Sequence, residues 1–306
     1  MQDPMLEPLT GVQNSNTGNK GSLKHTPPAL ARLERLRGVR ASYQRATQKQ
    51  NGKGWLANVP WITWIVTLVT CGLWCITAYQ VALHAGAQSW RDVLASVFSN
   101  SENGDVLLAF GAKYNPAIIQ GQYWRLVTPI FLHANILHLG LNMLNFFILG
   151  PIVERIFGHI RFALIYLLTG IASALASFVF APQEISVGAS GAIFGLVGAY
   201  SIFILAHRLA FRHGGITALA WLILVIGLNL ALGFVIPNVD NYAHVGGLLS
   251  GCLLGWFFTP FYRVTIQDGQ PVLADAHSLK RRWPLALLTI VLTVLIAIIA
   301  IHFVGG

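Results

Sequence analysis

Charge is scarce in this sequence. Only 10% of the 306 residues are Asp, Glu, Lys or Arg, whereas water-soluble domains carry about 25%. Hydrophobic residues make up 55% of the chain. This composition excludes an ordinary water-soluble domain and indicates a protein that lies largely in lipid.

Cysteine is scarce as well. The chain has three, of which Cys71 and Cys75 lie one helical turn apart and Cys252 is distant in sequence. A buried thiol usually packs as a small hydrophobic side chain, so the pattern indicates neither a metal site nor a redox centre. We expect no metal and no organic cofactor, because the candidate functional groups identified below are all side-chain or backbone groups.

Apolar runs of about 20 residues, the length that crosses a bilayer, occur seven times. Because helices satisfy their own backbone hydrogen bonds in lipid, the sequence predicts an all-α, multi-pass membrane helix bundle. The first run begins only near Val59, so no cleavable signal peptide is expected. The predicted spans are residues 59–83, 130–150, 162–181, 187–206, 214–236, 243–261 and 284–304.

The net charge of +9 follows the predicted topology and gives no sign of a nucleic-acid partner. Seventeen of the 20 Lys and Arg residues lie on alternate connections: nine in 1–58, two in 151–161, two in 207–213 and four in 262–283. This positive-inside pattern predicts a cytoplasmic N-terminus and an external C-terminus. The exceptions are Arg91, Lys113 and Arg125.

Three regions follow from these patterns. Residues 1–58 are basic and expected to be largely disordered, 59–261 form the core, and 262–306 comprise a cytoplasmic connection and the seventh span. Within the first region, "PPALARLERLRGVRASY" is compatible with a short helix on the anionic leaflet or with a disordered tail. The long connection 84–129 is rich in aromatic residues, which predicts a segment lying in the membrane interface.

Polar side chains at membrane depth are costly and are therefore functional candidates. Four stand out: His138 and Asn142 in the second span, Ser190 at the start of the fourth, and His244 at the start of the sixth. These three spans all run from outside to inside in the predicted topology, so the four side chains lie toward the external face. His133 lies about 140° around the helix from His138, which indicates a structural role.

The four side chains fit one reaction. Ser190 is a suitable nucleophile if His244 accepts its proton. Backbone N–H groups at the start of a helix, such as that of Gly191, can bind an oxyanion. His138 and Asn142, four residues apart on one helix face, add two side-chain donors.

Small residues flank both candidate positions and suggest close helix packing. The fourth span contains Gly191, Gly195 and Gly198, and the sixth contains Gly247, Gly251 and Gly255. The spacing predicts that these spans touch, which would bring Ser190 to His244. At this point, pure packing for the serine and a proton-relay or satisfied structural role for the histidines remain open alternatives.

Taken together, the motifs resemble those of rhomboid intramembrane serine proteases. Two are similar to the family's Gly-x-Ser-Gly and Ala-His-x-x-Gly-x-x-x-Gly: Gly188-Ala189-Ser190-Gly191, and Ala243-His244 with Gly247 and Gly251. Three more are "HANILHLGLN" (His133, His138, Asn142), Trp124-Arg125, and Glu154-Arg155.

The resemblance implies a six-span rhomboid core over 59–261 plus one extra C-terminal span. It also implies a Ser190–His244 dyad without a third acidic residue, which agrees with the absence of carboxylates inside spans two, four and six. His138, Asn142 and Gly191 would bind the oxyanion. The structural candidates are His133, Trp124, Arg125, Glu154, Arg155, Gly188, Gly195, Gly247 and Gly251.

The sequence therefore predicts an intramembrane serine endopeptidase in the bacterial cell membrane, cutting transmembrane substrates near their external ends. Its partners are these substrates and membrane lipids, and no oligomeric state is indicated. The alternative is a catalytically silent relative that binds or escorts client helices. A transporter is disfavoured because no carboxylate lies in the predicted membrane interior.

Overall fold

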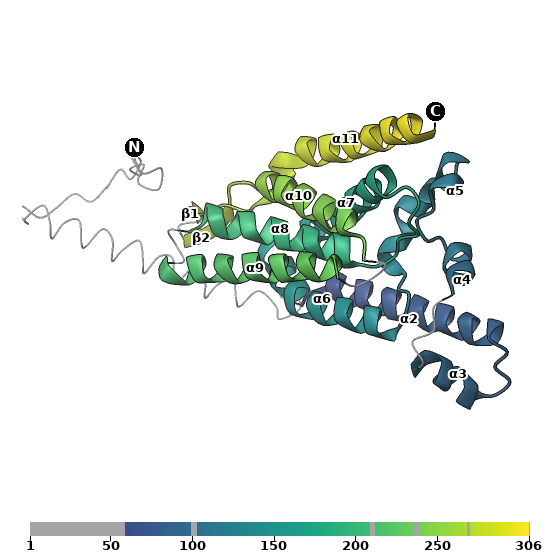
Figure 1. Ribbon diagram of the computed structural model, residues 1–306. Coiled ribbons are helices and arrows are strands. Elements are labelled where there is room, and N and C mark those ends of the chain that lie inside the picture. The colour runs from purple at the N-terminus through teal and green to yellow at the C-terminus, as the bar shows by residue number, and fades with distance from the viewer. Residues whose placement is uncertain (1–58, 99–102, 209–211, 236–238, 268–269, 306) are drawn as a thin grey trace, which may run out of the picture.

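Seven long helices account for most of the described part of the chain (Figure 1). The computed structural model describes residues 59–98, 103–208, 212–235, 239–267 and 270–305, and the interpretations of region 1–58 fall outside these ranges. Each predicted span corresponds to one helix, which confirms the all-α multi-pass bundle. The helices are α2 (Trp61–His84), α6 (Ile136–Phe157), α7 (His159–Phe180), α8 (Ser190–Ala206), α9 (Arg212–Gly233), α10 (Asn241–Phe258) and α11 (Leu279–Gly305).

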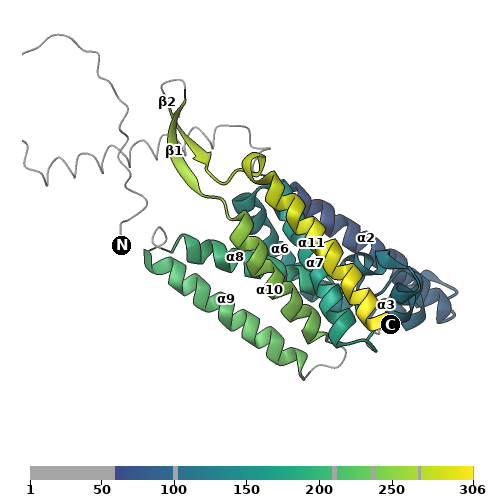
Figure 2. The same cartoon turned by 90° about the horizontal axis from the view of Figure 1, so that it is seen from above.

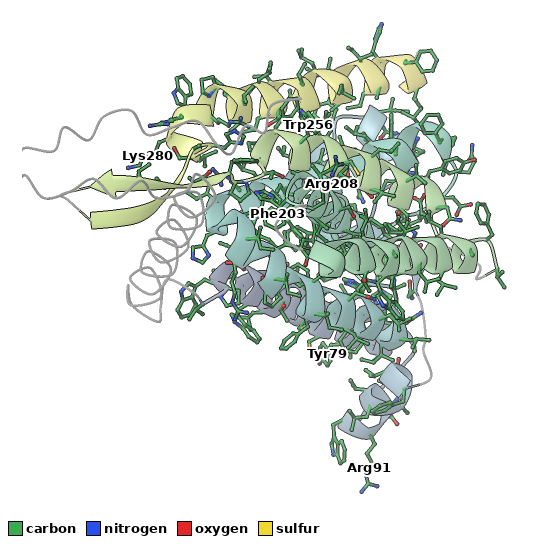
Figure 3. The ribbon with its side chains drawn as sticks, turned by 90° about the vertical axis from the view of Figure 1, so that its left-hand side faces the viewer. Tyr79, Arg91, Phe203, Arg208, Trp256 and Lys280 are labelled. Atoms are coloured by element: carbon green, nitrogen blue, oxygen red, sulfur yellow. The ribbon has the colours of Figure 1, made fainter. Side chains whose placement is uncertain are left out.

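Length and hydropathy identify membrane-spanning helices directly. Among the described residues, α2, α6, α7 and α11 are each long and apolar enough to cross a bilayer, and α8 is a shorter apolar helix. Large apolar side chains, among them Tyr79 and the 70% exposed Trp256, lie on the outside of the bundle (Figure 3). Extended apolar surface of this kind suits lipid and not water, so the chain is an integral membrane protein.

Helix α8 lies inside the bundle, between α7 and α10. Its residues from Gly191 to Ala199 are all buried. A helix that is apolar on every side and surrounded by other helices is buried on every side. The position of Ser190, the first residue of α8, is therefore fixed by the packing of α8 against α7 and α10.

The contact between α8 and α10 is made by backbone against backbone. A Cβ atom added at Gly247 would overlap the carbonyl of Gly191, and one added at Gly251 would overlap the carbonyl of Gly195. At Gly255 an added Cβ would lie 2.6 Å from a Cα atom of α8. The predicted contact between the fourth and sixth spans is thus confirmed, and small residues allow the approach.

A buried carboxylate joins the end of α6 to the start of α2. Glu154 accepts hydrogen bonds from the backbone N–H groups of Ile62 (2.9 Å) and Thr63 (2.8 Å), and from the Thr63 hydroxyl (2.6 Å). Oε1 of Glu154, which binds the N–H of Ile62, also lies 2.6 Å from Nδ1 of His159. Helix α2 has no side-chain cap of its own, so Glu154 satisfies N–H groups that helix geometry leaves without partners. The neighbouring Arg155 is exposed.

Short helices fill the described part of the connection between α2 and α6. They are α3 (Trp90–Phe98), α4 (Gly104–Ala109), α5 (Asn115–Ile119), η2 (Tyr123–Leu126) and η3 (Thr128–Phe131). Arg91 lies at the tip of α3, away from the bundle (Figure 3). The interfacial position of this connection remains a prediction.

Two buried cations hold this connection together. The Arg125 guanidinium donates from Nη1 to the carbonyls of Leu108 and Ala112, both at 2.9 Å, whereas the Trp124 side chain is 55% exposed. Nζ of the fully buried Lys113 donates to the carbonyls of residues 181 (2.7 Å) and 184 (2.9 Å) in the α7–α8 loop. The connection is therefore fastened to the loop that leads into Ser190.

The connection between α10 and α11 contains a feature that the sequence analysis did not predict. Strands β1 (Tyr262–Gln267) and β2 (Gln270–Asp275) form an antiparallel hairpin, which lies at the opposite end of the molecule from α3 and the C-terminus (Figure 2). Asp275 at its base accepts from Nη2 of Arg161 at 2.6 Å, and both side chains are largely buried. This ion pair ties the hairpin to the first turn of α7.

Substituting Gly251 tests the backbone contact of α8 and α10. We expect Gly251→Ala to lower the melting temperature in detergent, because overpacking typically costs about 1–3 kcal/mol. The matched control is Gly72→Ala in α2, where an added Cβ meets nothing within 4 Å. That control should be neutral or slightly stabilising, since Ala is favoured over Gly within a helix by roughly 0.5–1 kcal/mol. Equal melting temperatures for the two variants would contradict the packing described here.

Candidate active site

A serine and a histidine from two different helices meet near one end of the bundle. Oγ of Ser190, the first residue of α8, lies 2.9 Å from Nε2 of His244 in the first turn of α10. The imidazole ring stacks on Phe194, one turn along α8, with ring centroids 4.6 Å apart and planes at 20°. The stacking fixes the ring plane, so the histidine presents one nitrogen to the serine hydroxyl.

Asp240 begins helix α10. Its side chain accepts a hydrogen bond from the N–H of Ala243 at 2.9 Å, and its carbonyl accepts from the N–H of His244 at 3.2 Å. Within the described part of the chain, Oδ2 of Asp240 and Nδ1 of His244 are buried and have no hydrogen-bond partner. The sequence analysis passed over Asp240 because it lies just before the predicted span, although its place four residues ahead of His244 is readable in the sequence.

His138 lies beside the residues that precede Ser190. The backbone of Gly188 has φ of +124°, and a Cβ atom there would lie 2.8 Å from Nε2 of His138 and 3.8 Å from Oγ of Ser190. Glycine is required at this point both by the backbone conformation and by the nearby ring. Ser190 and His138 are therefore close neighbours.

His133 contacts both the turn that precedes Ser190 and the ring of His138. Its Nε2 accepts from the N–H of Ala189 at 3.4 Å, and its ring packs edge-on against His138 with centroids 5.1 Å apart. Both atoms of this hydrogen bond are buried. The arrangement positions the residue before Ser190 relative to the start of α6.

Asn142 lies one turn after His138 on α6 and is buried. Its Nδ2 donates to the carbonyl of His138 at 2.9 Å, and Asn135 caps the helix by accepting from the N–H of His138 at 2.8 Å. An amide nitrogen has two hydrogens, so this bond leaves Asn142 a second donor. The first turns of α6 thus supply two side chains of donor character on one helix face.

The start of α8 adds backbone donors. The first intrahelical bond of this segment runs from the N–H of Ile193 to the carbonyl of Ala189 at 2.9 Å. The N–H groups of Ser190 and Gly191 precede it, in the first turn, where helix geometry provides no carbonyl partner. They carry the positive end of the helix dipole, which favours an anion.

A cavity of about 400 Å³ lies at the start of α10, and Asp240 is the residue described above that lines it. Its walls are the α7–α8 loop, the end of α9 and the start of α10, including Glu184, Asp240 and Tyr242. Burial lowers the pKa of Lys113, behind the loop, to about 8, against the opposing effect of the Asp240 and Glu184 carboxylates. The cavity wall therefore carries two carboxylates, and the Lys113 ammonium is within electrostatic range of both.

Among the described residues, no three His, Cys, Asp or Glu side chains are grouped so that they could hold a metal ion.

The site residues predicted from the sequence divide into those near Ser190 and those elsewhere. One group lies at the starts of α6, α8 and α10 and in the segments just before α6 and α8: Ser190, His244, His138, Asn142, Gly191, His133 and Gly188. Trp124, Arg125, Glu154 and Arg155 lie in the connections and at the α6–α7 turn, and Gly195, Gly247 and Gly251 pack α8 against α10.

Comparison with known proteins places these residues in a family. Residues 120–261 match the family described as Rhomboid domain. The chain is 47% identical to Rhomboid protease GluP of Bacillus subtilis (strain 168) over 158 residues, which are 52% of this chain and 30% of GluP. It is 35% identical to RHOMBOID-like protein 5 of Arabidopsis thaliana over 213 residues (65% and 68% of the two chains).

A third relative is covered almost completely. The chain is 32% identical to Putative rhomboid protease YdcA of Bacillus subtilis (strain 168) over 213 residues, which are 68% of this chain and 92% of YdcA. The chain thus spans less than a third of GluP but most of YdcA. Together with the helical bundle and the arrangement of Ser190 and His244, these similarities show that the chain belongs to the rhomboid family.

Proposed function

We propose that this protein is a serine endopeptidase that cleaves transmembrane segments of membrane proteins, with Ser190 as nucleophile and His244 as general base. The observation that carries the proposal is the 2.9 Å contact between Oγ of Ser190 and Nε2 of His244. A serine hydroxyl becomes an effective nucleophile when an adjacent base accepts its proton. The printed names of GluP and YdcA, both called rhomboid proteases, support the same reaction class.

Acylation follows from this geometry. Oγ of Ser190 attacks the carbonyl carbon of the substrate, its proton passes to Nε2 of His244, and the carbonyl electrons move to oxygen. When the tetrahedral intermediate collapses, the C–N bond breaks and His244 returns the proton to the leaving amine. Water then attacks the acyl-enzyme with His244 again as base, which releases the second product and restores Ser190.

The oxyanion would be bound by groups at the starts of α8 and α6. The proposed donors are the N–H of Gly191 at the positive end of α8, the His138 ring beside Gly188, and the second amide hydrogen of Asn142, one turn after His138 on α6. Such donors act mainly on the transition state because they face charge that develops only there.

The substrate must be locally extended to react. A carbonyl within an intact transmembrane helix is hydrogen-bonded, so cleavage is expected near helix-breaking Gly or Pro residues. The positive-inside pattern supports a cytoplasmic N-terminus and therefore a site on the external side of the membrane. We place the enzyme in a bacterial cell membrane, with single-span proteins as substrates.

The dyad is tested with variants matched on the same helix. Ser190→Ala and His244→Ala should each abolish cleavage of a model transmembrane substrate, because nucleophile and base act as a unit. The serine control is Ser201→Ala, in α8, whose hydroxyl donates to the carbonyl of Val197 at 2.8 Å. A fluorophosphonate should label wild type and Ser201→Ala but not Ser190→Ala.

Two outcomes would count against the proposal. If His244→Ala still cleaves at a substantial rate, His244 is not the base. If folded wild type is neither labelled nor active on any transmembrane substrate, the catalytically silent relative that binds client helices becomes the better description.

The oxyanion role is tested on α6. Asn142→Ala should reduce kcat by about 10²–10³, the usual cost of removing one oxyanion donor, with little change in KM. Asn145→Ala is the control, since Asn145 makes the equivalent bond to the Leu141 carbonyl on the exposed side of the helix. His138→Ala should behave like Asn142→Ala. Lower melting temperatures with normal kcat per folded molecule would assign both residues to packing instead.

A further inference from the structure

We infer that Asp240 is a positioning residue of the Ser190–His244 dyad, whose carboxylate stabilises the imidazolium that forms when His244 takes the serine proton. The inference rests on the proposed function of these two residues. It adds a charged group to a site whose sequence pattern indicated only a serine and a histidine.

The geometry places the two side chains on one end of α10. Asp240 caps the helix and His244 follows one turn later, as the hydrogen bond from the His244 N–H to the Asp240 carbonyl shows. Asp240 is the N-cap residue, with φ of −84° and ψ of 87°, so it lies directly before the helical turn that contains His244. The carboxylate is therefore within direct electrostatic range of the ring.

The hydrogen bonds separate the two carboxylate oxygens of Asp240, because only one of them is used by the helix. Oδ1 of Asp240 is used in the cap, where it accepts from the N–H of Ala243. Oδ2 is buried without a partner in the described part of the chain, and so is Nδ1 of His244, the nitrogen turned away from Ser190. Buried polar atoms normally have partners. Oδ2 of Asp240 is an acceptor, and Nδ1 of His244 is a donor when the ring is protonated. Because both are buried without partners within one helical turn, they indicate an attraction that arises when the ring becomes charged.

The proton balance is unchanged by this role. The serine proton moves to Nε2 of His244 and then to the leaving amine, and no proton passes to or from Asp240. Its contribution is the attraction between a fixed negative charge and a positive charge that exists only in and around the transition state. Interactions of that kind raise kcat and leave KM unchanged.

A neighbouring cation limits the size of the effect. The Lys113 ammonium is within electrostatic range of Asp240 and partly offsets its charge. For two unit charges about 7 Å apart at an effective dielectric constant of about 20, Coulomb's law gives an attraction equivalent to about 50-fold in rate. With the Lys113 offset we expect a loss of about 10- to 50-fold.

The experiment separates the charge of Asp240 from its cap. Asp240→Asn and Asp240→Ser both keep a good N-cap side chain but remove the charge. Each should lower kcat on a transmembrane model substrate by about 10- to 50-fold, with KM and the detergent melting temperature unchanged. The rate at which a fluorophosphonate modifies Ser190 should fall with kcat. Glu184→Gln, which removes a carboxylate from the same cavity, is the matched control and should remain at the wild-type rate.

Two results would overturn the inference. One is that Asp240→Asn and Asp240→Ser keep kcat within about twofold of wild type, which at an effective dielectric of about 20 leaves no significant charge interaction. The other is that both lower kcat and melting temperature together, which would assign Asp240 to helix capping alone. Either result leaves the dyad intact as long as Ser190→Ala remains inactive and wild type cleaves, so this inference and the proposed function fail by different observations.

Discussion

The close approach of α8 and α10 is the constraint on which the rest of the structure depends. Gly247 and Gly251 press against the carbonyls of Gly191 and Gly195, with no side chain between the two backbones at these positions. In lipid, where burial of apolar surface gives little advantage, such packing is a main source of helix association. Ser190 directly precedes this contact, and His244 lies one turn before Gly247 and two turns before Gly251 on α10. The same contact that stabilises the bundle therefore sets the distance between Oγ and Nε2.

Three buried charged side chains hold the connections in place, as the glycines hold α8 against α10. Arg125 binds two carbonyls of its own loop, Lys113 binds two carbonyls of the α7–α8 loop, and Glu154 binds two N–H groups of α2. Each is a buried charge satisfied by backbone groups, which avoids the cost of an unpaired buried charge. Of the three, Lys113 binds the loop that leads into Ser190, so the serine is positioned by this loop as well as by the contact of α8 with α10.

Much of this arrangement could be predicted from the sequence because lipid imposes simple rules. Span length, alternating loop charge and four-residue glycine spacing are local patterns, and they were enough to bring Ser190, His244, His138 and Asn142 to one end of a helical bundle. The hairpin at 262–275 was not predicted, since a short strand pair in a polar connection has no comparable periodicity. The burial of Lys113 was missed because its partners lie about 70 residues away in the chain. Asp240 was missed because its role depends on how α10 begins.

The most direct test of this account is a structure of the protein after reaction with a fluorophosphonate in detergent or lipid. We expect phosphorus bonded to Oγ of Ser190, and a phosphoryl oxygen within hydrogen-bond distance of the Gly191 N–H and of the His138 and Asn142 side chains. His244 should remain beside the adduct, held by its stacking on Phe194. An adduct on another residue, or a phosphoryl oxygen turned away from the starts of α6 and α8, would contradict the account.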